Sequence, residues 1–143
     1  MGIFLKEINL KGKTALITGA TKGLGRGTAI AIAEAGGDII AIGRNQSELD
    51  TLKKEVKKFK VNYKSFNCDV NNYYKIKLII SNLKKLDILV NNAGTNIPEP
   101  FLNVKKSSME TLLNVNTKAV FNVAQLCANQ IIKLKRKNGS IIN

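Results

Sequence analysis

Short apolar runs alternate along the chain with longer segments in which apolar residues recur at helical spacing. The short runs are too brief for independent helices, so they predict strands over residues 13–18, 38–43, 62–68, 86–91 and 140–143. The longer segments predict helices over residues 24–35, 45–58, 71–83 and 108–134. This order of strands and helices is typical of a parallel α/β sheet.

Two of these helices begin at a pattern that resembles a capping box. Asn45 precedes the second helix with Glu48 three residues later, and Ser107 is followed in the same way by Glu110. In such a box the first side chain accepts a hydrogen bond from the third helical amide. We therefore expect Asn45 and Ser107 to cap their helices.

A glycine-rich turn, Thr18–Gly25, joins the first strand to the first helix. Glycines at 19, 23 and 25 allow a sharp turn, a close approach of backbone amides to a phosphate, and tight packing of the helix. The spacing G-x-x-x-G-x-G differs from the commoner G-x-G-x-x-G of dinucleotide-binding folds. Its place between a strand and a helix predicts dinucleotide binding, although three such glycines also occur in ordinary tight loops.

The end of the second strand bears on which dinucleotide binds. An acidic residue there holds the ribose of NAD, whereas this sequence has Arg44 and no carboxylate. A guanidinium suits the 2′-phosphate of NADP, and Lys22 in the glycine turn adds a second cation. We therefore favour NADP(H) over NAD(H) as cofactor. The alternative is that both cations are simply exposed in a basic chain.

Composition limits the other classes of function. The chain has 143 residues, a formal charge of +13, no histidine and two cysteines, which argues against a metal site or a histidine-based triad. Only three of its 23 basic residues are arginine, and the lysines are scattered, so nucleic-acid binding stays a minor alternative.

No apolar run is long enough to span a membrane. The N-terminal stretch contains Lys6 and Glu7 and no signal-peptide cleavage pattern, so a cytoplasmic protein is expected.

Four motifs occur in the same order as in one known family. They are Thr18–Gly25 (TGATKGLG), Cys68-Asp69-Val70, Asn91-Asn92-Ala93-Gly94 and Asn114-Val115-Asn116. With these motifs the chain resembles the short-chain dehydrogenase/reductase family, most of all its gluconate 5-dehydrogenase-type and 3-oxoacyl-carrier-protein-reductase-type members. The resemblance implies a Rossmann-like, doubly wound parallel sheet of strand order 3-2-1-4-5 and hydride transfer between a nicotinamide cofactor and a carbonyl or secondary alcohol.

The resemblance also assigns roles to residues. It implies that the glycine turn binds the cofactor's pyrophosphate and that Asp69 and Val70 bind the adenine. It also implies that Asn116 is the helix asparagine of the catalytic tetrad, where the backbone of the helix is distorted. Residues Thr95–Phe101 are expected to border the substrate pocket. The full set expected to bind the cofactor is Gly19, Thr21, Lys22, Gly23, Leu24, Gly25, Arg44, Asp69, Val70, Asn91, Ala93 and Gly94.

The family's remaining catalytic residues have no counterpart here. A serine, then a tyrosine and a lysine, follow the fifth strand in the family; Ser140 stands too early to match that serine. Tyr73 and Lys77 fit the pattern Y-x-x-x-K, but they precede the fourth strand, whereas the family's pair follows the fifth. We therefore expect these two residues to be neighbours on a surface helix with no catalytic role. The chain is therefore expected to be the N-terminal, cofactor-binding part of a domain of roughly 250 residues, inactive alone.

Three alternatives remain open. A naturally short protein with a frayed end would also fit the sequence, as would a non-catalytic dinucleotide-binding or interaction module. The third is the basic nucleic-acid binder. The last long helix is apolar on more than one side, which predicts a homo-oligomer, as in the family, or deep burial within one subunit.

Overall fold

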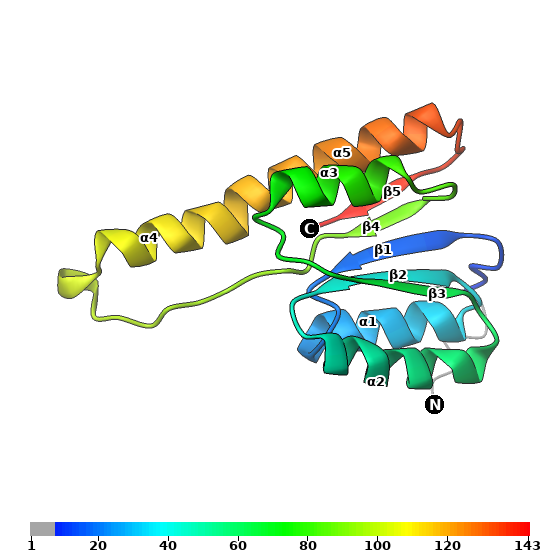
Figure 1. Cartoon of the computed structure of the whole chain (residues 1–143), viewed down its shortest axis with the longest axis horizontal. Helices are drawn as coiled ribbons and strands as arrows, with labels where there is room; N and C mark the ends of the chain where they lie inside the picture. Colours follow the sequence, from blue (N-terminus) through cyan, green and yellow to red (C-terminus); the bar gives the residue numbers. More distant parts are fainter. Residues whose placement is uncertain (1–7) are drawn as a thin grey trace.

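The computed structural model describes residues 8–143, so the segment of Lys6 and Glu7, used above against a signal peptide, lies outside the described residues. Five parallel strands form one sheet in the order β3-β2-β1-β4-β5 (Figure 1). They are β1 (Thr14–Thr18), β2 (Asp38–Gly43), β3 (Tyr63–Asn67), β4 (Ile88–Val90) and β5 (Ser140–Ile142). The predicted Rossmann-like sheet and its strand order 3-2-1-4-5 are confirmed.

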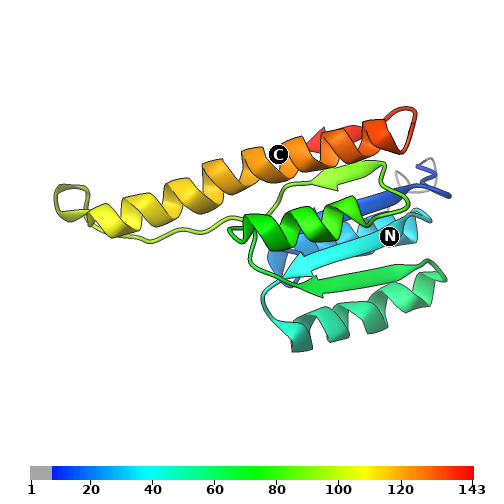
Figure 2. The same ribbon diagram turned by 45° about the horizontal axis from the view of Figure 1, so that its top comes forward.

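Helices cover both faces of the sheet (Figures 1 and 2). On one face lie α1 (Gly23–Glu34) and α2 (Gln46–Val56), which a short 3-10 turn, Lys57–Phe59, extends. On the other face lie α3 (Tyr73–Ser81) and α5 (Val120–Lys133). Each layer has its own apolar core, centred on Ile17 and Leu49 on one side and on Leu16 and Leu89 on the other. The predicted ranges differ from these by no more than about two residues at either end.

The last long helix is continuous but not uniform. It starts as α4 (Lys106–Leu113), widens into a π-helix over Asn114–Ala119 and continues as α5. Its first half projects beyond the sheet, and the loop after β4 runs outward beside it before the chain turns back into the helix (Figure 1). A 3-10 turn, Phe101–Asn103, lies in that loop.

One of the two predicted helix caps is present. Asn45 Oδ1 accepts from the Glu48 amide at 3.2 Å. The cap expected at Ser107 is wrong: Ser107 lies inside α4, and its carbonyl accepts from the Thr111 hydroxyl at 2.9 Å. The helix starts earlier, at Lys106, and the Glu99 carboxylate from the preceding loop accepts from the amide of Lys105, just before it, at 3.3 Å.

No helix within residues 8–143 has the length and apolar character to cross a membrane.

Candidate functional site

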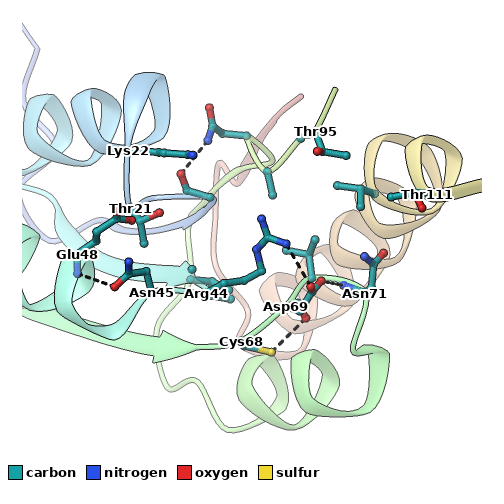
Figure 3. Close-up of a pocket in the computed structure, with 18 residues that line it drawn as sticks. Thr21, Lys22, Arg44, Asn45, Glu48, Cys68, Asp69, Asn71, Thr95 and Thr111 are labelled. Carbon is teal, nitrogen blue, oxygen red and sulfur yellow. Dashed lines mark hydrogen bonds and ion pairs between the residues drawn. The ribbon is translucent and has the colours of Figure 1, made fainter. Parts of the chain in front are cut away.

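A cleft of about 590 Å³ lies at the carboxyl ends of β1 to β4 (Figure 3). This volume is in the usual range for a small-molecule site, and this edge of an open parallel sheet is where such folds bind ligands. The loops after four strands and the helix α4 with its π segment supply the walls. The lining residues are Gly19, Thr21, Lys22, Ile42, Gly43, Arg44, Asn45, Glu48, Cys68, Asp69, Val70, Asn71, Asn92, Ala93, Gly94, Thr95, Thr111 and Val115.

The first glycine of the turn is required by both conformation and space. Gly19 has φ +63°, and a Cβ built there would lie 2.9 Å from the Ala93 Cα and 3.0 Å from the Asn92 Nδ2. A side chain at this position would push the β4 loop away from the turn. Gly19 therefore lets two walls of the cleft touch.

The start of α1 leaves its first amides without a side-chain partner. Lys22 stands at the cap position and makes no capping hydrogen bond, and the first turn has no acidic residue. Gly23, at φ +54°, has nothing within 4 Å of where a Cβ would be. Uncapped amides and the helix dipole favour an anion at this point. Gly25 instead is buried where a Cβ would collide with the Gly19 carbonyl and the Asn92 amide, so it supplies the close packing expected of it.

Thr18 and Asn92 lock the glycine turn to the β4 loop. The Thr18 hydroxyl accepts from the amides of Asn92 and Ala93 at 3.1 and 3.0 Å. The Asn92 side chain donates in return to the carbonyls of Thr18 and Gly19 at 3.0 and 3.2 Å. Four hydrogen bonds within the chain thus hold the glycine turn against the β4 loop.

Arg44 and Asp69 face each other across the other end of the cleft (Figure 3). Their closest charged atoms, Arg44 Nη1 and Asp69 Oδ2, are 3.8 Å apart, and the arginine side chain is 78% exposed. Asp69 Oδ1 also accepts from the Asn71 amide at 2.8 Å. An ion pair this long and exposed is worth little, so Arg44 can exchange its partner for a ligand anion.

Cys68 lies in the same wall and was not expected there. Its thiol is buried and donates to the Asp69 carbonyl at 3.3 Å. Burial raises its pKa above the ordinary value; the Lys75 charge opposes this and the Asp69 charge adds to it. The thiol is therefore protonated and weakly nucleophilic near neutral pH.

Five of the expected residues lie outside the cleft wall, namely Gly23, Leu24, Gly25, Asn91 and Asn116. Leu24 is 85% exposed on α1. The buried Asn91 amide donates to the Val120 carbonyl at 3.0 Å and to Asn143 Oδ1 at 3.1 Å, so it connects β4 to α5 and to the segment after β5. Asn116 lies in the π segment, where the resemblance implied a distorted helix, and its side chain bonds the backbone of Thr95.

Other lining residues had no signal of their own in the sequence. Thr111 and Val115 stand four residues apart and so share one side of the long helix, but only the fold shows that this side faces the cleft. In the sequence, Glu48 stands out only as part of a capping box. Of the expected loop 95–101, Thr95 lines the cleft, whereas Phe101 is 90% exposed and lies outside it. Within residues 8–143, no three His, Cys, Asp or Glu side chains gather as metal ligands do.

Comparison with known proteins agrees with the resemblance seen in the motifs. Residues 13–143 match the family described as short chain dehydrogenase. The chain is 35% identical to mouse L-xylulose reductase over 137 residues and 34% identical to the 3-oxoacyl-[acyl-carrier-protein] reductase of Thermotoga maritima over 140. It is also 34% identical over 143 residues to 2-dehydro-3-deoxy-D-gluconate 5-dehydrogenase of Pseudoalteromonas atlantica. These matches cover 96%, 95% and 96% of this chain but only 54%, 56% and 56% of the relatives, about half their length.

Solved structures give the same result. A putative 2-deoxy-D-gluconate 3-dehydrogenase from Agrobacterium tumefaciens, with bound NADP, superposes with a TM-score of 0.84 at 28% identity, over 94% of this chain and 53% of that one. Carveol dehydrogenase from Mycobacterium avium, in complex with NAD, superposes with a TM-score of 0.86 at 25% identity, over 93% and 54%. Motif order, strand order and sequence match agree, and the chain belongs to the short-chain dehydrogenase family.

Proposed function

We propose that this chain is the cofactor-binding part of an NAD(P)-dependent oxidoreductase that interconverts a carbonyl compound and a secondary alcohol. One observation carries the proposal: the glycine turn, the Arg44–Asp69 pair and the β4 loop line a single cleft. The family's reductases and dehydrogenases, and the NAD and NADP held by its solved members, support it.

The cleft fits such a dinucleotide in shape and charge. Gly19 and Gly25 leave no room for side chains between the turn and the β4 loop, and the uncapped amides of α1 open beside them. We assign the pyrophosphate to this turn, the adenine to Asp69 and Val70, and the middle of the cofactor to Ala93 and Gly94. When bound, the nicotinamide would supply or accept the hydride; the chain's residues would orient it and exclude water.

The proposed preference for NADP(H) rests on Lys22 and Arg44. Both line the cleft, and the strand between them ends in Gly43 with no carboxylate. A 2′-phosphate would offer Arg44 a doubly charged partner in place of the distant Asp69, and guanidinium–phosphate pairs are frequently bidentate. Glu48 is the acidic side chain on that wall, but it belongs to the first turn of α2 rather than to the strand end.

We propose that these 143 residues bind cofactor without turning over substrate. Tyr73 and Lys77 stand at the start and middle of α3, and neither lines the cleft. No other Y-x-x-x-K pattern occurs in the sequence. In a complete active site the proton donor would come from residues that follow β5. The cytoplasmic location of the protein stays a prediction.

The test is equilibrium binding of NADPH and NADH to the chain, followed by nucleotide fluorescence. Tighter binding of NADPH is expected, and Arg44→Gln should reduce the NADPH affinity roughly tenfold with little effect on NADH, since one charge-assisted contact is lost. Lys53→Gln, which removes an exposed charge from α2, is the matched control. Binding of neither nucleotide would overturn the proposal and favour an interaction module; NADPH-dependent reduction of a ketone by this chain alone would overturn its inactivity.

We also propose that the long helix pairs with a second copy. Four large apolar side chains on it are at least half exposed: Met109, Leu113, Phe121 and Ile132. Burying them would remove apolar area from water at about 25 cal/mol per Å². Light scattering should show a dimer or larger assembly that Phe121→Asp weakens; a monomeric wild-type chain would contradict the proposal.

A further inference from the structure

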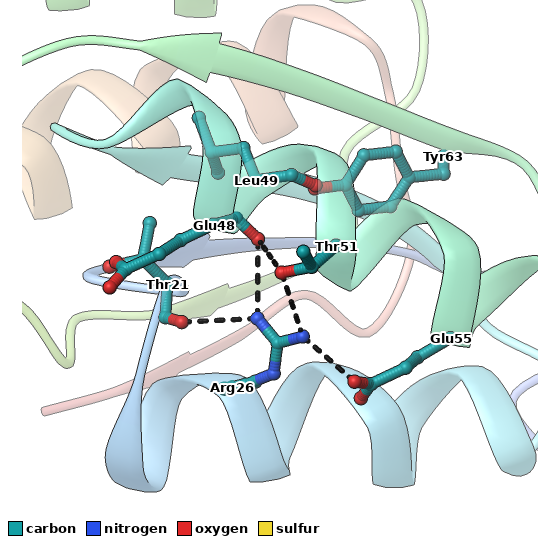
Figure 4. A network of polar contacts seen from close by, with 7 residues as sticks. All are labelled: Thr21, Arg26, Glu48, Leu49, Thr51, Glu55 and Tyr63. Carbon is teal, nitrogen blue, oxygen red and sulfur yellow. Dashed lines mark hydrogen bonds and ion pairs between the residues drawn. The ribbon is translucent and has the colours of Figure 1, made fainter.

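Arg26 lies behind the cleft and touches two of its walls at once (Figure 4). Its side chain leaves α1 four residues after the cap position and is only 21% exposed. Nη1 donates to the carbonyl of Thr21 and to the carbonyl of Glu48, both at 3.2 Å. Thr21 belongs to the glycine turn and Glu48 to the first turn of α2, and both line the cleft. Arg26 itself does not line it.

The second nitrogen of the same guanidinium fixes its orientation. Nη2 donates to the Thr51 hydroxyl at 3.1 Å and to Glu55 Oε1 at 2.8 Å. The Thr51 hydroxyl in turn donates to the Glu48 carbonyl at 2.8 Å. The planar fork is therefore held by α2 on one side and by the glycine turn on the other, a geometry that lysine cannot reproduce.

The two walls joined in this way hold the two cations assigned to the 2′-phosphate. Lys22 directly follows Thr21, and Arg44 directly precedes the Asn45 cap of α2. The two walls also pack directly against each other at Gly43, where an added Cβ would collide with the Thr21 methyl group. The distance between the Lys22 and Arg44 backbones thus depends on the contact at Gly43, on the hydrogen bond from the Ala20 amide to the Ile42 carbonyl at 3.1 Å, and on the bonds from Arg26.

We infer that Arg26 is a positioning residue for cofactor selectivity: it holds Lys22 and Arg44 at the spacing that suits a 2′-phosphate without touching the cofactor. This inference rests on the proposed function. Its contacts with Thr21 and Glu48 are to backbone carbonyls, so the substitution of Arg26 alters the placement of both cations while their charges stay in place. The substitution should therefore weaken the binding of NADPH more than that of NADH, because only NADPH has a 2′-phosphate to lie between the two cations.

The test compares Arg26→Lys with the wild-type chain and with two controls. Glu55→Gln removes one partner's charge but leaves the two carbonyl bonds. Arg136→Lys changes another hydrogen-bonded arginine, whose contacts with Asp87 and Gly12 lie near the amino ends of the strands, away from the cleft. We expect the ratio of NADPH to NADH affinity to fall roughly fivefold or more in Arg26→Lys, the lower end of typical coupling between sites. Both controls should keep the wild-type ratio even where their stability falls.

Hydrogen exchange provides a readout that needs no nucleotide. In Arg26→Lys, the amides of residues 21–25 and of the first turn of α2 should exchange faster, while those of β1 should not change. Wild-type exchange at both walls, or an unchanged affinity ratio in a wild-type chain that prefers NADPH, would overturn the inference alone. If the wild-type chain binds neither nucleotide, or binds both equally, the selectivity assigned to Lys22 and Arg44 fails first and the role of Arg26 with it.

Discussion

Asn116 and Thr95 are joined by a pair of side-chain to backbone hydrogen bonds. Asn116 Oδ1 accepts from the Thr95 amide at 2.9 Å, and Nδ2 donates to the Thr95 carbonyl at 2.8 Å. The Asn116 carboxamide thus bonds both the amide and the carbonyl of Thr95, as the backbone of a neighbouring strand would. Since Thr95 lines the cleft and Asn116 lies in the π segment, the pair couples the widened helix to the cleft wall. The pair uses Oδ1 and one of the two N–H groups of the Asn116 carboxamide.

Asn116→Ala should loosen the loop without unfolding the chain. The loss of two hydrogen bonds at a largely exposed site should lower the free energy of unfolding by about 1–2 kcal/mol. Hydrogen exchange at the Thr95 amide should become faster, because its acceptor is gone, and urea titration measures the stability. Asn129→Ala, at an exposed position of α5, is the control; it should leave exchange at Thr95 unchanged and should not lower the stability, since alanine is the better helix former. Equal exchange at Thr95 in both variants would show that the pair does not hold the loop.

Two glycines of α1, two residues apart, should respond in opposite directions to alanine. Gly25→Ala places a methyl against the Gly19 carbonyl and the Asn92 amide, which the backbone cannot easily avoid. We expect a loss of roughly 2 kcal/mol or more in unfolding free energy and loss of nucleotide binding. At Gly27 nothing lies within 4 Å of a new Cβ, so Gly27→Ala should stabilise the helix by about 0.5–1 kcal/mol. Similar midpoints for both variants in thermal unfolding would contradict this account of Gly25.

The fold was predictable because most of its strands are apolar enough to be identified without their partners. The run DIIAIG is too short for an independent helix and almost wholly apolar, which predicts a buried strand, and it forms β2. The candidate site followed from residues adjacent to strand ends, where Gly19, Arg44 and Asp69 stand. All three line the cleft.

What the sequence did not show depends on contacts between distant segments. Ser107 fits the local rule for a helix cap, but Glu99 satisfies the amide of Lys105 from the preceding loop, and the helix starts earlier. Arg26 was one of many cations in the sequence, and its bonds to the Thr21 and Glu48 carbonyls require α2 to lie beside α1. Periodicity also cannot tell which side of the long helix will face a cleft.

The two cysteines should differ in how a ligand protects them. Burial raises the pKa of Cys127 to about 12, and this thiol is wholly inside the core, so it should react with a thiol reagent only on unfolding. Cys68 has a raised pKa too, but it lines the cleft. In a Cys127→Ala variant, slow labelling of Cys68 should become slower still with NADPH present. Labelling unaffected by NADPH would place the nucleotide away from Cys68.

Asp87 should make stability depend on pH in the acid range. It is 1% exposed, accepts from Arg136 Nε at 2.8 Å and from the Thr14 amide at 2.9 Å, and lies 4.0 Å from the Lys13 ammonium. Burial raises the pKa of this carboxyl, but the Arg136 and Thr14 hydrogen bonds and the two cations outweigh burial and leave it below its ordinary value of 3.8. Because the folded pKa is the lower one, the stabilisation is present above the unfolded pKa and is lost as pH falls through the folded pKa.

Asp87→Asn should therefore cost most at neutral pH. Arg136 is 30% exposed, so the charge that the substitution leaves behind is still partly hydrated, and the loss of charge-assisted hydrogen bonds should lower the free energy of unfolding by about 1.5–3 kcal/mol. Urea unfolding of both chains from about pH 7 to about pH 3 should show this gap narrow below roughly pH 4, as the wild-type carboxyl becomes protonated. Asp50→Asn, which removes a charge from an exposed site on α2, should show no such convergence. A gap that stays constant over the whole range would mean that Asp87 acts through packing and hydrogen-bond geometry alone.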